Sequence, residues 1–159
     1  MNKINDITEA VIGAAIDVHR EFRPGMLESV CEACLIVELE RRGLLVEQQV
    51  PVRVHFRGTP VGCGYRMDLL VEHCVIVEVK AVERLGPVHA AQLLSYLRLS
   101  GHKVGLLINF NVRTLKRGLR RLVNGLRESK AGEPAEEDTS SVEADSKVGL
   151  SLRPPRPLR

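Results

Sequence analysis

The chain of 159 residues has no tryptophan, only three Phe and two Tyr, and no run of about 18 apolar residues that could cross a membrane. Its first residues lack the apolar core of a signal peptide, because Asn5, Asp6 and Glu9 interrupt it. We therefore expect a cytoplasmic protein with no membrane partner. Its four cysteines are expected to be reduced thiols rather than a disulfide framework. The scarcity of aromatic residues gives little support to recognition of single strands by base stacking.

Acidic residues are missing from a long interval, although the formal net charge of the whole chain is only +3. No Asp or Glu lies between Glu83 and Glu128, whereas nine Lys or Arg residues fall there. This imbalance predicts an anion-attracting surface in the second half of the fold.

The composition also divides the chain. A hydrophobic content of 44% indicates a globular protein. Residues 129–159 have no aromatic residue and no periodicity, and they end in a proline-rich basic stretch. We predict a single domain over residues 1–128 and a disordered tail over 129–159.

Hydrophobic periodicity predicts the element order α-α-β-β-β-α-β-α. The expected helices cover 6–22, with Asp6 or Thr8 as the cap, 27–42, 87–100 and 112–127, and the expected strands cover 50–56, 61–71, 75–82 and 104–110. The fold class is therefore α/β. We expect a mixed four-stranded sheet flanked by helices, mostly antiparallel, with one parallel strand reached by a helical crossover.

Polar residues on the second and third expected strands suggest chemistry. Glu78 and Lys80 are two residues apart in an apolar strand, so their side chains share one face of the sheet. Asp68 opposes Glu78 if the hairpin loop consists of residues 72–74. Charged groups on such a strand are costly to bury without a partner or a function.

Two carboxylates and a backbone carbonyl, for which Val79 is the natural candidate, are oxygen ligands of the kind Mg²⁺ prefers. Lys80 is placed to orient a water or to offset developing negative charge during phosphodiester hydrolysis. A cross-strand salt bridge of Lys80 with Glu78 or Asp68 fits the same spacing equally well.

The spacing of Asp68 and Glu78-X-Lys80 resembles the motif of the PD-(D/E)XK nuclease superfamily. Residues 25–31, Gly-Met-Leu-Glu-Ser-Val-Cys, resemble the signature of the GxxExxY protein family within the RecB-like branch. The resemblance extends over about residues 7–123. Cys31 replaces the signature Tyr, and Met67 stands at the Pro position. The resemblance implies a restriction-endonuclease-like core, with Asp68 and Glu78 as metal ligands and Lys80 as the catalytic lysine.

The resemblance also implies roles for helical residues. Glu28 would contribute an acidic group from the second helix, although an interaction with the helix dipole explains its position too. Gln92 and Tyr96 are four apart and resemble the Gln-x-x-x-Tyr motif of RecB-like nucleases. In that role Gln92 would bond near the metal site or the nucleic-acid backbone, whereas such a pair is otherwise a polar helix edge.

The expected last helix carries five bases on its polar faces: Arg113, Lys116, Arg117, Arg120 and Arg121. Such residues bind phosphates in a salt-dependent way, although a basic face is also typical of a solvated surface.

The four cysteines, Cys31, Cys34, Cys63 and Cys74, match the number of thiolates in a zinc or iron–sulfur site. Because Cys31 and Cys34 lie on the apolar side of a helix, we predict core packing and expect neither zinc nor an iron–sulfur cluster.

We therefore predict a nuclease that hydrolyses phosphodiester bonds through metal-activated water, with Mg²⁺, or Mn²⁺ in its place, as cofactor and DNA favoured over RNA as substrate. The alternative is a nuclease-fold module that binds nucleic acid or another partner with little or no hydrolysis. Cys31 in place of Tyr favours that alternative. The sequence does not indicate a homo-oligomer.

Overall fold

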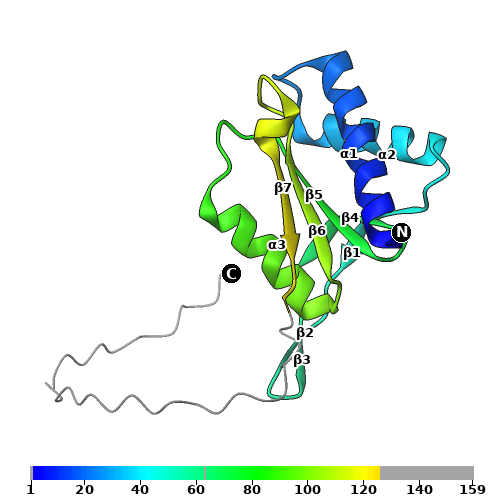
Figure 1. The fold of residues 1–159 in the computed structure, drawn as a ribbon. Helices are drawn as coiled ribbons and strands as arrows, with labels where there is room; N and C mark the ends of the chain where they lie inside the picture. The colour runs from blue at the N-terminus through cyan, green and yellow to red at the C-terminus, as the bar shows by residue number, and fades with distance from the viewer. Residues whose placement is uncertain (1, 63, 126–159) are drawn as a thin grey trace, which may run out of the picture. The chain divides into compact units, whose positions relative to one another are not determined.

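The computed structural model describes residues 2–62 and 64–125, so the predicted tail at 129–159 lies outside the described residues. Figure 1 shows the fold. The elements are α1 (Lys3–Phe22), α2 (Glu28–Arg41), β1 (Val46–Pro51), β2 (Val54–Phe56), β3 (Thr59–Val61), β4 (Arg66–Val71), β5 (Val75–Lys80), α3 (Pro87–Ser100), β6 (Val104–Asn109), the 3₁₀ helix η1 (Leu115–Gly118) and β7 (Leu119–Val123).

The main sheet has five strands in the order β1-β4-β5-β6-β7. Strands β5 and β6 are parallel and are joined through α3, while the other neighbours are antiparallel. The α/β class and the parallel strand reached by a helical crossover are thus confirmed. Strands β2 and β3 form a separate two-stranded ribbon, which extends away from the main sheet in Figure 1.

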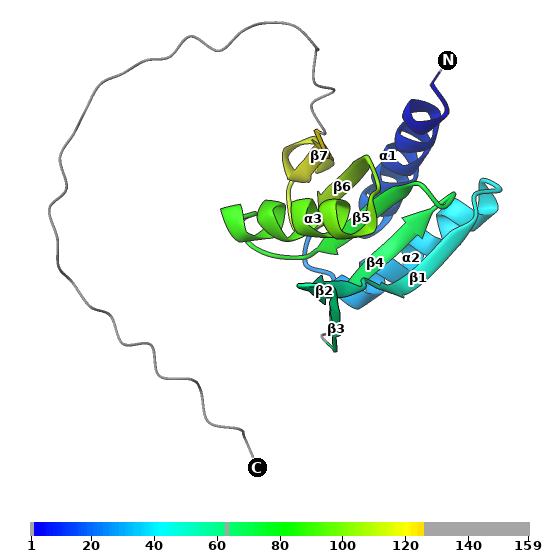
Figure 2. The same cartoon turned by 90° about the horizontal axis from the view of Figure 1, so that it is seen from below.

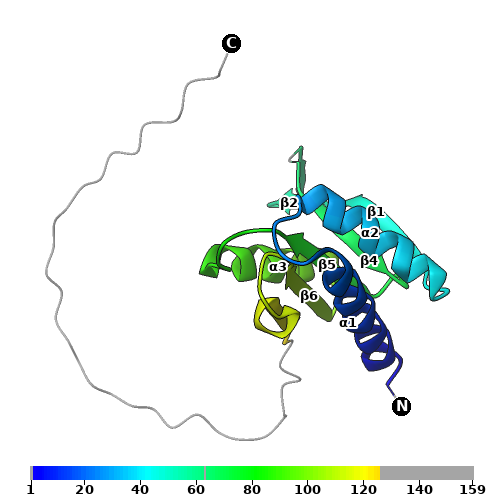
Figure 3. The same ribbon diagram turned by 90° about the horizontal axis from the view of Figure 1, so that it is seen from above.

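Helices cover both faces of the main sheet, with α1 and α2 on one side and α3 on the other (Figures 2 and 3). On the first face the core joins Ala14 and Leu35 to Val77. On the second face it joins Leu93 to Ile76. Strand β5 is therefore covered on both faces. Its two charged residues, Glu78 and Lys80, lie at its C-terminal end, where the buried strand ends.

The first three expected helices are present as α1, α2 and α3, but the cap of α1 differs from the expectation. Asn2 is the N-cap, and its Oδ1 accepts a hydrogen bond from the amide of Ile4 at 3.3 Å. The expected cap at Asp6 or Thr8 is wrong, because Thr8 lies inside the helix and donates its hydroxyl to the Ile4 carbonyl. Of the described helices, none is long and apolar enough to cross a membrane.

The β4–β5 hairpin has the predicted three-residue loop, since Val71 pairs with Val75. Two of the four expected strands are each divided. The strand expected at 50–56 breaks between Pro51 and Val54, and the strand expected at 61–71 breaks between Val61 and Arg66. The small ribbon therefore lies between β1 and β4 in the chain.

The helix expected at 112–127 is wrong. Its place is taken by η1 and by β7, which pairs antiparallel with β6. Leucines spaced three and four apart gave the helical pattern, but β6 is buried and would otherwise leave a row of backbone groups at the sheet edge without partners. The expected four-stranded sheet consequently has a fifth strand.

Candidate active site

The candidate site lies where β4 and β5 separate. Their backbone pairing ends at Leu69 and Val77, and side chains bridge the next step. The amide of Asp68 donates to Glu78 Oε1 at 3.0 Å, and the amide of Val79 donates to Asp68 Oδ2 at 2.9 Å. Each carboxylate thus takes the place of a backbone carbonyl on the opposite strand, which brings the two acidic side chains together.

Burial controls the charge of Glu78, whose residue is 2% exposed. Loss of hydration, reinforced by the negative charge of Asp68, raises the pKa of Glu78 to about 8. The hydrogen bond from the Asp68 amide and the charge of Lys80 oppose this rise. The carboxyl group is therefore largely protonated at neutral pH unless a cation stabilises its ionised form.

Lys80 ends β5 and is half-buried on the same face as Glu78. It pairs with Asn109 at the end of β6, and its carbonyl accepts the amide of Phe110 at 2.8 Å. The ion pairs among the described residues do not include Lys80, so the structure does not form the alternative salt bridge with Glu78 or Asp68.

Glu28 reaches this end of the sheet from the first turn of α2. Its Oε2 accepts the amide of Ala81, directly after Lys80, at 3.3 Å. One turn later Glu32 accepts a hydrogen bond from Gln49 at 3.0 Å. Burial raises the pKa of Glu32, and the charges of Asp68 and Glu28 raise it further. Helix α2 therefore adds two acidic groups to the electrostatics of the site.

Helix α3 brings Gln92 and Tyr96 to the site from the other face. The Gln92 amide donates to the Tyr96 hydroxyl at 2.7 Å. Tyr96 packs in one buried cluster with Met67, the neighbour of Asp68, and with Ile76 of β5. Burial raises the pKa of Tyr96, and so do the charges of Glu78 and Asp68. The ring of Tyr96 also packs edge-on against Tyr65, with centroids 5.6 Å apart.

Three of these residues were missed in the sequence. Glu32 could have been found as the residue one helical turn after Glu28. Tyr65 lies three residues before Asp68, but a lone tyrosine in a glycine-rich loop gives no signal. Asn109 is buried, and its side chain accepts from the Val82 amide at 3.0 Å and donates to the Val82 carbonyl at 2.8 Å. It thereby fixes the chain just after Lys80.

The donor set fits a hard divalent cation. Hydrogen bonds within the described residues occupy Asp68 Oδ2 and Glu78 Oε1, and each carboxylate has a second oxygen. The part of the chain that the structure describes holds no group of three or more His, Cys, Asp or Glu residues arranged for a metal. Two carboxylates completed by waters and a backbone carbonyl suit Mg²⁺, which keeps several waters.

The five predicted phosphate-binding bases are exposed but do not share a helical face. Arg113, Lys116 and Arg117 lie in the loop and η1 after β6. Arg120 and Arg121 are neighbours in β7 and therefore point to opposite faces of the sheet. Arg121 donates to Asn5 of α1 at 3.1 Å.

The cysteines of α2 pack as predicted. Cys31 is buried in the core beneath α1 and α2, and Cys34 is half-buried against it. Burial raises the pKa of the Cys31 thiol, with a further contribution from Cys34. Cys63 lies outside the described residues.

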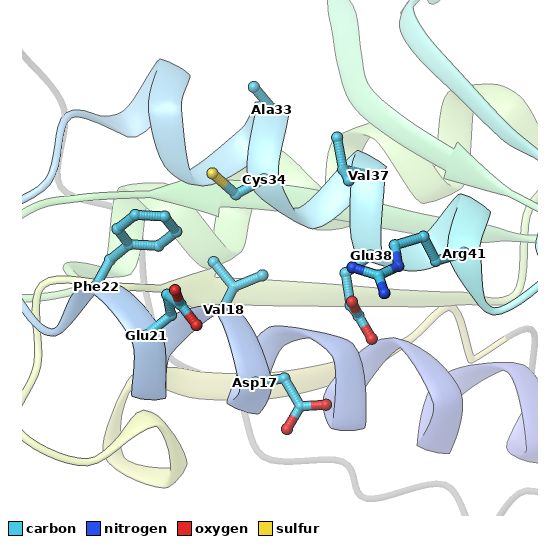
Figure 4. Close-up of a pocket in the computed structure, with 9 residues that line it drawn as sticks. All are labelled: Asp17, Val18, Glu21, Phe22, Ala33, Cys34, Val37, Glu38 and Arg41. Carbon is cyan, nitrogen blue, oxygen red and sulfur yellow. The ribbon is translucent and has the colours of Figure 1, made fainter.

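A groove between α1 and α2, of about 410 Å³, lies apart from these residues (Figure 4). Asp17, Glu21 and Phe22 line it from α1, and Cys34 and Val37 line it from α2. No residue predicted for the site faces this groove.

The mixed sheet flanked by helices, with paired carboxylates and a lysine at the end of β5, has the architecture of a restriction-endonuclease-like core. The chain matches, over residues 5–122, the family model described as PD-(D/E)XK nuclease superfamily. It therefore belongs to the PD-(D/E)XK nuclease superfamily. Neither a search of curated proteins nor a search of solved structures gave a match. The match does not distinguish the GxxExxY family or the RecB-like branch.

Proposed function

We propose that this protein is a metal-dependent nuclease that hydrolyses phosphodiester bonds of nucleic acid, with DNA favoured over RNA and Mg²⁺ or Mn²⁺ as the cofactor. Membership of a nuclease superfamily supports the class of reaction. The observation that carries the proposal is the pairing of the Asp68 and Glu78 carboxylates at the open end of β4 and β5.

Asp68 and Glu78 would hold the divalent cation, and the carbonyl of Val79, which lies between Glu78 and Lys80, is the proposed third protein ligand. When bound, such a cation polarises a phosphoryl oxygen and makes water more acidic. Glu78 must lose its proton to serve as a ligand, because its pKa of about 8 keeps it largely neutral at pH 7 even beside Lys80.

The remaining residues act on the water and on the phosphate. Lys80, on the same face as Glu78, would orient the attacking water and offset the negative charge that develops on the phosphate. Glu28 would add negative charge beside the cation. Gln92, whose side chain donates a hydrogen bond to Tyr96, would contact the substrate near the acidic pair.

The test incubates purified protein with linear, supercoiled and single-stranded DNA, and with RNA, in Mg²⁺ or Mn²⁺. Asp68→Asn and Lys80→Ala are expected to abolish cleavage. Asp6→Asn and Lys103→Ala make the same chemical changes at exposed positions in α1 and before β6, and they should cleave like the unaltered protein.

Cleavage that survives in Asp68→Asn and Lys80→Ala would identify a contaminant and contradict the proposal. Absence of cleavage on every substrate would contradict it as well, and would favour a binding module with the same fold.

A further inference from the structure

A second hollow, of about 400 Å³, lies between α3 and the segment before β4. Its lining combines two tyrosine rings, small apolar side chains, an amide and a hydroxyl. The lining residues are Tyr65, Val88, Ala91, Gln92, Ser95 and Tyr96. Tyr65 lies three residues before Asp68, and Tyr96 packs in one buried cluster with Met67, the neighbour of Asp68, and with Ile76 of β5, so the hollow lies on the face of the sheet that carries the acidic pair.

The two tyrosines of the chain play different parts in this hollow. Tyr96 is buried, whereas Tyr65 is 45% exposed. The two rings are inclined by 72°, so Tyr65 rests against Tyr96 in an edge-on contact. The Tyr65 carbonyl accepts the amide of Val52 at 2.8 Å, which anchors the loop. Tyr65 therefore presents an aromatic ring that contacts Tyr96 and is partly open to solvent.

The segment that carries Tyr65 has a charge suited to nucleic acid. Residues 48–67 contain no Asp or Glu, but they contain Arg53, Arg57 and Arg66, which are all exposed. An acid-free segment with three arginines attracts a phosphate backbone. The same segment includes the β2–β3 ribbon, where Arg57 lies over the exposed ring of Phe56 at 5.3 Å.

We infer that the hollow is a nucleobase subsite, in which a base next to the phosphate at Asp68 and Glu78 stacks on Tyr65 while Gln92 and Ser95 contact its polar edge. This inference rests on the proposed function, because it takes nucleic acid as the substrate. A duplex keeps its bases stacked inside the helix, so the occupant is a base of a single strand or of a frayed end. Stacking on an aromatic ring tolerates every base.

The test measures binding in EDTA, where no metal-dependent hydrolysis occurs. It compares the unaltered protein with its variants on two ligands. The ligands are a single-stranded DNA of about 12 nucleotides and an abasic strand of the same length. Tyr65→Ala should weaken binding of the base-bearing strand by about tenfold and leave binding of the abasic strand unchanged. Tyr65→Phe keeps the ring and should stay within about twofold of the unaltered protein.

Phe22→Ala is the matched control, because Phe22 is 42% exposed but lines the groove between α1 and α2. It should affect neither ligand. Ala91→Trp provides a second variant if Tyr65→Ala fails to fold, since it fills the hollow from a partly exposed position of α3 and should selectively weaken binding of the base-bearing strand.

Equal losses on both ligands, no loss on either, or no detectable binding of the base-bearing strand would overturn the subsite. DNA cleavage without this selectivity would leave the nuclease proposal intact and refute the subsite alone. Selective binding of the base-bearing strand without cleavage in any metal would support the subsite and refute the nuclease proposal.

Discussion

At Glu78 the position of the side chain opposes its ionisation. The strand places it among apolar residues and beside Asp68, so the carboxyl retains a proton that an exposed glutamate would have lost. The same two carboxylates hold β4 and β5 together at their open end through bonds from backbone amides. A bound cation would stabilise the ionised form of Glu78 beside Asp68, which makes cation binding and the stability of this end of the sheet interdependent.

The raised pKa of Glu78 predicts how stability depends on pH in EDTA. Between about pH 4.5 and about pH 8 the folded protein keeps a proton that the unfolded chain releases. Stability therefore falls as pH rises through this window, by up to about 1.4 kcal/mol per pH unit from this group. Glu78→Gln should remove that fall and be relatively more stable at the alkaline end.

Urea denaturation across this window measures the effect. Glu40→Gln is the control, because Glu40 is exposed on α2, and it should keep the slope of the unaltered protein. An identical pH slope in Glu78→Gln and in the unaltered protein would refute the assignment.

At the scale of elements, β7 depends on a close approach at Gly118. A Cβ atom at this position would lie 2.3 Å from the Asn109 carbonyl oxygen and 3.0 Å from Val112. The chain leaves β6 at Asn109 and returns as β7 at Leu119, so the glycine permits the tight return. Because Asn109 also holds Val82, a shift there would reach the segment after Lys80.

Gly118→Ala should therefore destabilise the protein by about 2 kcal/mol or more, because the backbone must move to admit the methyl group. It should also reduce amide protection in β7 before other strands. Gly125→Ala is the control, since a Cβ atom there meets nothing within 4 Å. Thermal unfolding and hydrogen exchange provide the measurements, and equal stability of the two variants would contradict this explanation of the turn.

At the scale of the whole molecule, the charges are arranged by the tertiary structure rather than by one helix. Lys116 and Arg117 lie in η1, which follows the end of β6 where Asn109 pairs with Lys80. They therefore lie toward the end of the sheet that holds the acidic pair. Arg121, by contrast, is engaged with Asn5 of α1. Of the five predicted bases, Lys116 and Arg117 of η1 are therefore the pair to test for phosphate binding.

Lys116→Ala combined with Arg117→Ala should weaken duplex DNA binding and lower its salt slope by about 0.9 for each phosphate that the variant no longer binds. Arg20→Ala combined with Arg41→Ala removes the same charge near the groove between α1 and α2 and should leave the slope unchanged. Binding titrations in EDTA over a range of salt concentrations distinguish the two pairs. Equal slopes in both double variants would show that η1 does not bind the phosphates.

Some features of this protein were determined by the sequence itself, because they depend on local geometry. The period of two along Val75–Lys80 puts Glu78 and Lys80 on one face, and a three-residue loop sets Asp68 opposite Glu78. The limits of α3 follow from Pro87 at its start and from Gly101 at its end, where φ is 76°. These signals need no information from distant parts of the chain.

Only the tertiary structure decided the remainder. Residues 119–123 form a strand because the buried edge of β6 needs hydrogen-bond partners, although their leucines have helical spacing. Glu32 and Tyr65 join the site because α2 packs beside β1, where Gln49 bonds Glu32, and because the loop before β4 packs against Tyr96 of α3. Periodicity describes the faces of one element, whereas a site at the end of a sheet depends on which elements meet there, and that is set by packing.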